Sequence, residues 1–171
     1  LDGKGFHNVT RHCERPFDPV LRSVMEKVTM DVLNECGAAL GYTQSDEISL
    51  VLAPVCDLGD MYFGGRVQKL CSILASVASV SFNKYVRELH LDSVTMPGYF
   101  DCRCWNVPTL DFAADVIMWR QSDAVKNSIS MAAQTKFSHN KLLGKSGKDK
   151  ILMLKDIGVD YYSYRAEDRQ G

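Results

Sequence analysis

Two short extended segments stand between two long helical patterns in this chain, and this order restricts its fold more than any other feature. Apolar residues recur at helical spacing over residues 18–37 and again over residues 67–85. Between them, residues 38–42 and 48–53 have the short patterns of strands, with residues 44–47 at the expected hairpin tip. The two strands are therefore predicted to pair, and the helices to cover the sheet that they form.

Cap residues mark where the predicted helices begin and end. Asp18 is an N-cap carboxylate followed by Pro19 at the first helical position, and Gly37 is a suitable stop for the same helix. Thr109 is expected to cap a further long helix. Residues 148–155 are expected to form a short one.

A strand is expected on either side of this helix–hairpin–helix unit. Leu1 is taken as the end of the first strand, and residues 99–107 are read as the last one. The resulting order, β-α-β-β-α-β, predicts an α+β domain of the ferredoxin-like class, with an antiparallel sheet and helices on one face. The sequence contains no repeat or linker, so residues 1–171 are predicted to form a single domain. Because the chain opens without a methionine, we expect residues to be missing before Leu1, and we leave open whether more follow Gly171.

The composition excludes several classes of protein. The formal net charge of -1 lacks the basic excess of many nucleic-acid binders, so any contact with RNA would need a local patch. No apolar run is long enough to cross a membrane, and no signal peptide is visible. Six cysteines are scattered through apolar stretches, which favours reduced thiols in a cytoplasmic protein: Cys13, Cys36, Cys56, Cys71, Cys102 and Cys104. On a strand, Cys102 and Cys104 would face opposite sides, so they are predicted to be a poor zinc site.

Two acidic segments carry the candidate chemistry. Asp2 stands at a strand end before the glycine-containing loop Gly3–His7, in which successive backbone N–H groups can cradle a triphosphate. Asp46 and Glu47 are adjacent acids at the predicted hairpin tip. Taken alone, each segment reads more readily as a solvated surface turn. Taken together, one carboxylate from each of two neighbouring strands is the arrangement that holds two magnesium ions beside a nucleoside triphosphate.

Five segments resemble motifs of the tRNA-His guanylyltransferase-like proteins, the 3′–5′ RNA polymerases. They follow one another along the chain in the same order as in that family. Gly41–Ser49 is similar to the family's Tyr-Gly/Thr-Gln-Ser-Asp-Glu core, and Trp119–Asp123 is similar to its Trp-Arg-Gln-Ala/Ser-Asp segment. The other similar segments are Glu14–Asp18, Gly65–Leu70 and Tyr99–Arg103. The resemblance runs from the first residue to about the last, and it implies a palm-type catalytic domain like those of polymerases and nucleotidyl cyclases.

The resemblance also implies a role for each candidate residue. The metal ligands would be Asp2, the Gly3 carbonyl group and Asp46, and Glu47 would be a catalytic residue that supports the metals. The nucleotide would be bound by Asp2, Gly3, Lys4, Gly5, Phe6, His7, Ser45 and Asp46. RNA or phosphate groups would be bound by Arg15, Arg66, Lys69, Arg120, Asp123 and Asn127.

The reaction implied by the resemblance is template-dependent addition of nucleotides to the 5′ end of tRNA, in the 3′–5′ direction, after ATP or GTP activates the 5′ phosphate. Val125 occupies the position of a histidine in the eukaryotic branch, which favours the bacterial, archaeal and phage branch and 5′-end repair. The implied partners are tRNA or a tRNA-like RNA, nucleoside triphosphates, and further copies of the chain in a homotetramer. Lys141, Lys145, Lys148 and Lys150 form a basic cluster that is expected to contact RNA.

Three alternatives stay open from the sequence. A tRNA-His guanylyltransferase would add a single 5′ guanosine rather than copy a template. A nucleotidyl cyclase or another palm enzyme would act on free nucleoside triphosphates, although Trp119–Asp123 has no role in such an enzyme. A non-catalytic RNA-binding remnant is disfavoured because the chain retains Asp2, Ser45, Asp46 and Glu47.

Overall fold

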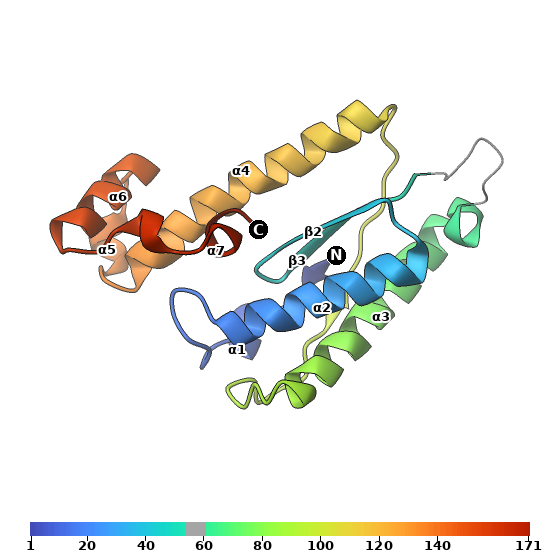
Figure 1. Ribbon diagram of the computed structural model, residues 1–171, viewed down its shortest axis with the longest axis horizontal. Coiled ribbons are helices and arrows are strands. Elements are labelled where there is room, and N and C mark those ends of the chain that lie inside the picture. The colour runs from blue at the N-terminus through green and yellow to red at the C-terminus, as the bar shows by residue number, and fades with distance from the viewer. Residues whose placement is uncertain (54–60) are drawn as a thin grey trace.

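The computed structural model describes residues 1–53 and 61–171, and Figure 1 shows how the helices and strands are arranged. The strands are β1 (Asp2–Gly3), β2 (Leu40–Gln44), β3 (Glu47–Val51) and β4 (Phe100–Asp101). The α-helices are α1 (Phe6–Val9), α2 (Pro19–Cys36), α3 (Val67–Glu88), α4 (Leu110–Gln134), α5 (His139–Leu142), α6 (Gly147–Asp156) and α7 (Ala166–Gln170). Two short 3-10 helices, η1 (Tyr62–Gly65) and η2 (Tyr161–Ser163), precede α3 and α7.

The helix boundaries follow the cap residues of the sequence. The Asp18 carboxylate accepts two backbone N–H bonds from the first turn of α2, at 2.9 and 3.0 Å, and Pro19 is the first residue of that helix. Gly37 ends α2 with a φ of 62°, a left-handed conformation in which glycine has no steric penalty. The Thr109 hydroxyl accepts the N–H of Phe112 at 3.2 Å and caps α4. The predicted starts of α2 and α4 and the predicted end of α2 are confirmed.

The four strands form one sheet in the order β2-β3-β1-β4, and every pair of neighbours is antiparallel. The hairpin pairs all of β2 with all of β3, and its turn lies at Ser45 and Asp46. The central strand β1 places Asp2 opposite Glu47 on one side and opposite Asp101 on the other. The prediction of a domain that combines helices with an antiparallel sheet is therefore confirmed.

The last strand is much shorter than the sequence predicts. A strand is expected over residues 99–107, but only Phe100–Asp101 forms one. The neighbouring strand β1 offers only Asp2 and Gly3 for pairing. Residues 102–107 therefore form no strand, because β1 offers them no residues to pair with.

This early end of β4 corrects the prediction for two cysteines. Cys102 and Cys104 do not point to opposite sides: both line one cavity of about 360 Å³ beside α3 and α4, and both interact with Cys71. Burial raises the pKa of both thiols. The cysteines of the described residues are free, in agreement with the predicted reduced thiols, whereas Cys56 lies outside those residues.

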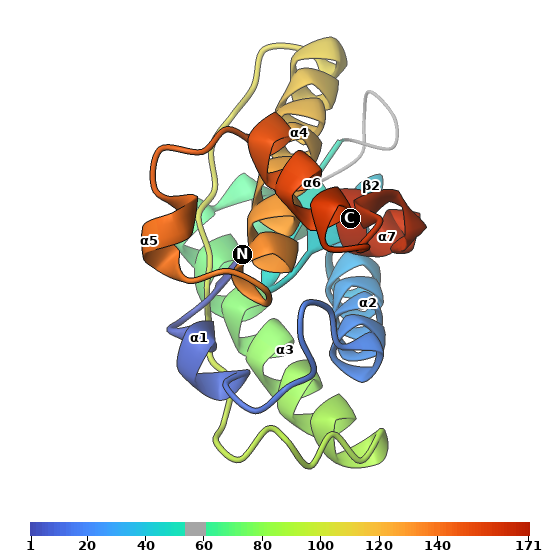
Figure 2. The same cartoon turned by 90° about the vertical axis from the view of Figure 1, so that its left-hand side faces the viewer.

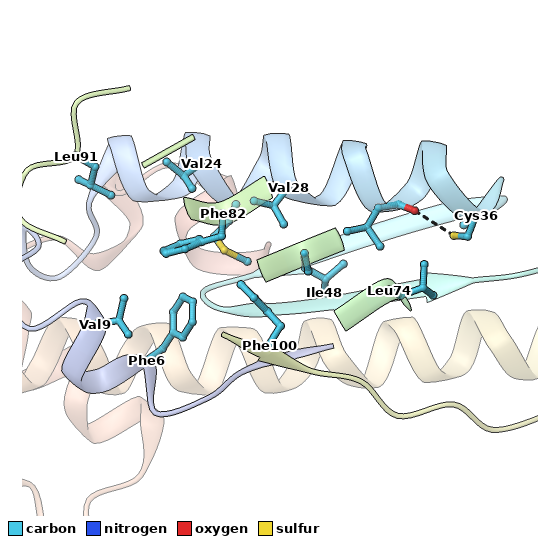
Figure 3. Packing of buried hydrophobic residues seen from close by; sticks show 14 residues of the cluster. Phe6, Val9, Val24, Val28, Cys36, Ile48, Leu74, Phe82, Leu91 and Phe100 are labelled. Carbon is cyan, nitrogen blue, oxygen red and sulfur yellow. Dashed lines mark hydrogen bonds between the residues drawn. The ribbon is translucent and has the colours of Figure 1, made fainter. Parts of the chain in front are cut away.

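Helices α2 and α3 pack side by side and enclose the main hydrophobic core against the sheet (Figures 1 and 3). At its centre Phe6, Phe82 and Phe100 meet edge to face, with ring centroids 5.0 to 5.8 Å apart. Figure 3 shows that Ile48 of β3 and Val28 of α2 belong to the same cluster. Removal of these large apolar side chains from water is the main stabilising contribution in this part of the chain.

Helix α4 lies on the other side of the hairpin from α2 (Figure 1). Glu47 of β3 contacts Arg120 of α4, whereas the next residue, Ile48, is buried in the core with side chains of α2 and α3. Helices thus cover both sides of the hairpin, so the prediction of helices on one face is wrong for α4. The C-terminal half of α4 packs with α5, α6 and η2 around a second hydrophobic cluster that includes Ala132 and Leu154 (Figure 2). Across the two described segments, no helix combines the length and apolar character that a membrane span needs.

Candidate active site

Carboxylates gather at one end of the sheet. Asp2 lies in register with Glu47 on β3 and with Asp101 on β4, and directly opposite residues of antiparallel strands project from the same face. The backbone N–H of Gly3 donates to the carbonyl oxygen of Asp46 at 3.1 Å, which fixes the hairpin tip beside β1. The sheet thus brings together the two acidic segments that the sequence singled out.

Asp46 is held in an environment that disfavours its negative charge. Burial raises the pKa of its carboxyl group, and the negative charges of Asp2 and Glu47 raise it further. Hydrogen bonds from its own backbone N–H and from the Ser45 hydroxyl, the latter at 3.0 Å, lower the pKa in part. A bound cation would reduce the repulsion between these carboxylates, because it would offset the charges of several of them at once.

The loop between β1 and α1 is shaped by Gly3 and Phe6. A Cβ atom at Gly3 would lie 2.3 Å from the Phe6 ring, so only glycine allows this ring to fold back into the core. Phe6 is 4% exposed and belongs to the hydrophobic core, although it also lines the cavity beside the hairpin tip. Gly5 precedes α1 with a φ of 62°, in the left-handed region. Lys4 and His7 are both exposed.

Arg120 of α4 pairs with the acidic end of the sheet. Its guanidinium forms an ion pair with Glu47 and lies 3.7 Å from Asp123, and its side chain is only 18% exposed. The same guanidinium lies 4.9 Å from the centre of the Trp119 ring, a cation–π contact. The Asn127 side chain donates to Asp123 at 3.5 Å. The three α4 residues predicted to bind RNA therefore lie in a row on one helix face, and the first of them reaches Glu47.

A cavity of about 530 Å³ opens beside the hairpin tip. Ser45 and Asp46 line it from the tip, His7 from α1, and Arg15 from the loop before α2. The C-terminal residues 167, 168 and 171 also line it. The sequence pointed to the first four residues but not to the C-terminal ones, because no local motif marks them. A volume of this order is suitable for a small organic ligand such as a nucleotide.

The sequence pattern of the family described as tRNAHis guanylyltransferase, or Thg1, matches residues 1–108. This chain belongs to that family. A bacterial Thg1-like protein in complex with ATP has the same fold, with a TM-score of 0.92, 35% sequence identity, and coverage of 99% of this chain and 75% of that one. A bacterial Thg1-like protein in complex with GTP gives a TM-score of 0.83 at 32% identity and covers 99% and 70% of the two chains.

One relative of this Thg1-family protein occurs in Acanthamoeba polyphaga mimivirus. It is an uncharacterized protein that is 41% identical over 96 residues, which are 52% of this chain and 33% of the viral protein. This chain therefore matches about a third of the length of that relative. The prediction of the family is confirmed.

Two of the residues predicted from the Thg1 likeness lie away from the acidic end of the sheet. Arg66 is the N-cap residue of α3 and Lys69 lies in its first turn, and this end of the helix is far from the hairpin tip (Figure 1). Both are exposed and contact Phe63: the Arg66 Nε donates to its carbonyl oxygen at 3.1 Å, and the Lys69 Nζ lies 4.8 Å from its ring. Any phosphate group that these two residues bind would therefore lie away from Asp46 of the same chain.

The carboxylates of this Thg1-family site fit a magnesium ion that also binds phosphate. Within residues 1–53 and 61–171, no group of three or more His, Cys, Asp or Glu side chains is placed to hold a metal by itself. Magnesium commonly takes only one or two carboxylates and completes its shell with water and substrate phosphates. Asp2 and Asp46 supply that number, and burial, with the charges of Asp2 and Glu47, raises the pKa of Asp46.

Proposed function

We propose that this chain adds nucleotides to the 5′ end of tRNA in the 3′–5′ direction, under the direction of a template, after ATP or GTP has activated the 5′ phosphate. The observation that carries the proposal is that the backbone of Gly3, next to Asp2, hydrogen-bonds Asp46 at the hairpin tip, where Asp46 lines a cavity of about 530 Å³. Family membership and the ATP and GTP complexes of the bacterial relatives support it.

In this proposal Asp2, the Gly3 carbonyl group and Asp46 hold two magnesium ions. When bound, the ions would neutralise the triphosphate and lower the pKa of the attacking 3′-hydroxyl group. His7 and Ser45 line the cavity and Lys4 is exposed, and we infer that these three residues bind triphosphate oxygens. Arg15 lines the same cavity and adds a positive charge.

Glu47 and Arg120 have a linked role in the proposed reaction. Their ion pair keeps the guanidinium beside the acidic end of the sheet, and Asp123 holds it from the next turn of α4. The contacts thus run from Glu47 through Arg120 and Asp123 to the exposed residue Asn127. We infer that this row orients the 5′ end of the RNA toward the bound nucleotide, because a guanidinium suits a phosphate group.

We also infer that the sheet order β2-β3-β1-β4, with α2 and α3 as its crossing helices, is the ferredoxin-like palm arrangement. The acidic end of the sheet then corresponds to the catalytic end of a palm. The homotetramer expected from the family likeness gains support from α4, on which Leu110, Phe112 and Met118 are 54% to 67% exposed. An apolar surface of this kind is typical of an interface between subunits.

The basic cluster of the C-terminal part is proposed to bind tRNA phosphates. Residues 136–155 contain six lysines and one acidic residue, Asp149, whose carboxylate caps α6 with Ser146. The chain as a whole has a formal net charge of -1, whereas lysines far outnumber acidic residues in this segment, and contacts with phosphates dominate affinity for RNA.

Replacement of Lys141, Lys145 and Lys148 by alanine together is therefore expected to weaken tRNA binding. Affinity for RNA falls as the salt concentration rises, and each lost phosphate contact should reduce the magnitude of the slope of log affinity against log salt by about 0.7 to 0.9. The triple variant should therefore have a slope that is smaller in magnitude by about 2. A filter-binding series from low to high salt measures this. Lys27→Ala, Lys84→Ala and Arg87→Ala together serve as the control, and an equal loss of slope in both triple variants would contradict the proposed surface.

The proposed activity is tested with a set of tRNAs that lack one 5′ nucleotide and differ in the nucleotide opposite the gap. Each is incubated with the protein, Mg²⁺ and one nucleoside triphosphate at a time. We expect extension by the complementary nucleotide in each case. Addition of guanosine alone, irrespective of the nucleotide opposite the gap, would show a guanylyltransferase instead. A cyclic product formed without RNA would show a cyclase, and no product of either kind would contradict an enzymatic role.

A further inference from the structure

The C-terminal segment of the chain reaches back to the beginning of α2. The Arg22 Nη1 lies 2.5 Å from the Asp168 Oδ1, across 146 residues of sequence, and the two side chains are only 19% and 12% exposed. The Tyr42 hydroxyl donates to the Gln170 carbonyl oxygen at 2.6 Å. A Cβ atom at Gly171 would lie 2.4 Å from that hydroxyl oxygen, so the segment packs closely on β2. These contacts attach α7 to both α2 and β2.

The same segment is attached to α4. Ser128, which is 1% exposed, donates through its hydroxyl to the Arg169 carbonyl oxygen at 3.2 Å and lies 2.7 Å from the Tyr161 hydroxyl. The Arg169 Nε donates to the Tyr164 carbonyl oxygen at 3.0 Å. Helix α7 has five residues, so its position depends on these contacts with other elements rather than on its own stability.

Helix α7 stands at the edge of the cavity beside the hairpin tip. Glu167, Asp168 and Gly171 line that cavity together with Ser45 and Asp46. Of the two carboxylates on this wall, Asp168 is paired with Arg22, which also lines the cavity, and the exposed Glu167 has a negative charge that repels the phosphates of a nucleotide. The same carboxylates can accept hydrogen bonds from the amino groups of a base or the hydroxyl groups of a ribose. The wall therefore suits the nucleoside end of the ligand, while the hairpin tip suits its phosphates.

We propose that the Arg22–Asp168 ion pair and the Tyr42–Gln170 hydrogen bond hold α7 as the wall that receives the nucleoside end of the nucleotide. Arg22 and Tyr42 are positioning residues in this proposal, which rests on the proposed function. Arg22 forms ion pairs with Asp168 and, at 3.6 Å, with Glu26. These two carboxylates offset the positive charge of its guanidinium, so we do not assign Arg22 a direct contact with phosphate.

The test is equilibrium binding of a fluorescent methylanthraniloyl nucleoside triphosphate to Arg22→Met and to Asp168→Asn, with inorganic tripolyphosphate as a second ligand. We expect each variant to bind the nucleoside triphosphate about tenfold more weakly and tripolyphosphate as wild type does. In turnover, KM for the nucleotide should rise with kcat unchanged. The exchanged pair, Arg22→Asp with Asp168→Arg, should restore binding, and Tyr42→Phe should weaken it to a smaller extent.

The two single variants also separate positioning from direct attraction between Arg22 and phosphate. Direct attraction predicts weaker binding in Arg22→Met but tighter binding of both ligands in Asp168→Asn, which would overturn the proposal, as would unchanged nucleotide binding in both variants. Lys84→Met, which breaks the exposed pair of Lys84 with Glu88, is the matched control and should change nothing. If wild type and Asp46→Asn bind the nucleotide equally, or if neither binds it, the proposed function fails instead.

Discussion

Asp46→Asn is expected to lower the rate of nucleotide addition about a thousandfold or more while the fold is retained. The substitution keeps the size of the side chain and removes the charge proposed to hold a metal. Single-turnover extension of a 5′-truncated tRNA measures the rate. Asp101→Asn is the matched control, because Asp101 lies on the other side of Asp2 in the sheet but is not a proposed ligand. An equal loss in both variants would indicate that only the total charge of the site matters.

The stability of the same variant gives an independent check. Burial, together with Asp2 and Glu47, raises the pKa of Asp46 in the folded chain above its ordinary value of 3.8. Because the pKa of Asp46 is higher in the folded chain than in the unfolded chain, the protonated carboxyl group stabilises the fold at pH values below its ordinary pKa. This stabilisation is lost as the pH rises through the pKa of Asp46 in the folded chain. Without metal, the free energy of unfolding of the wild type should therefore fall relative to that of Asp46→Asn over this pH range. Urea unfolding in EDTA measures the difference, and a variant that is the less stable of the two at neutral pH would contradict this assignment.

Phe82→Ala is expected to reduce the free energy of unfolding by about 3 to 5 kcal/mol. Phe82 is fully buried, and its ring centroid lies 5.0 Å from that of Phe6 and 5.8 Å from that of Phe100. A cavity at this position would free the Phe6 ring, which anchors the loop after Asp2. We therefore expect nucleotide binding to weaken together with stability.

Urea unfolding and nucleotide binding, both measured at low temperature, check this second result. Val80→Ala is a suitable control on the same helix, because Val80 is 70% exposed and its replacement should stay within about 0.5 kcal/mol of wild type. A Phe82→Ala protein within that limit would mean that the three aromatic rings do not form the core described here.

The parts of the fold that the sequence predicts are those with local causes. Asp18, Pro19 and Gly37 mark the ends of α2 because cap residues act on the adjacent backbone, and the alternation of side chains predicts the hairpin. The length of β4 depends instead on its neighbour. Residues 99–107 have the composition of a strand, but β1 pairs with only two of them.

The same distinction applies to the candidate site. Asp2 and Asp46 are found from the sequence because each stands in a recognisable local motif. The partner of Glu47 is 73 residues away on α4, and the partner of Arg22 is 146 residues away on α7. No periodicity or spacing reports such contacts. Phe6 lies in a glycine-containing loop, but its apolar ring is stabilised more by the core than by exposure to a ligand.

The most direct measurement is a Mn²⁺ titration followed by electron paramagnetic resonance, in the presence of a non-hydrolysable nucleoside triphosphate. Mn²⁺ replaces Mg²⁺ at oxygen ligands and reports each ion that is bound. We predict that wild type and Asp101→Asn bind Mn²⁺ with the nucleotide, and that Asp2→Asn and Asp46→Asn each lose most of this binding. Binding of Mn²⁺ that is the same in all four proteins would contradict a metal site shared by Asp2 and Asp46.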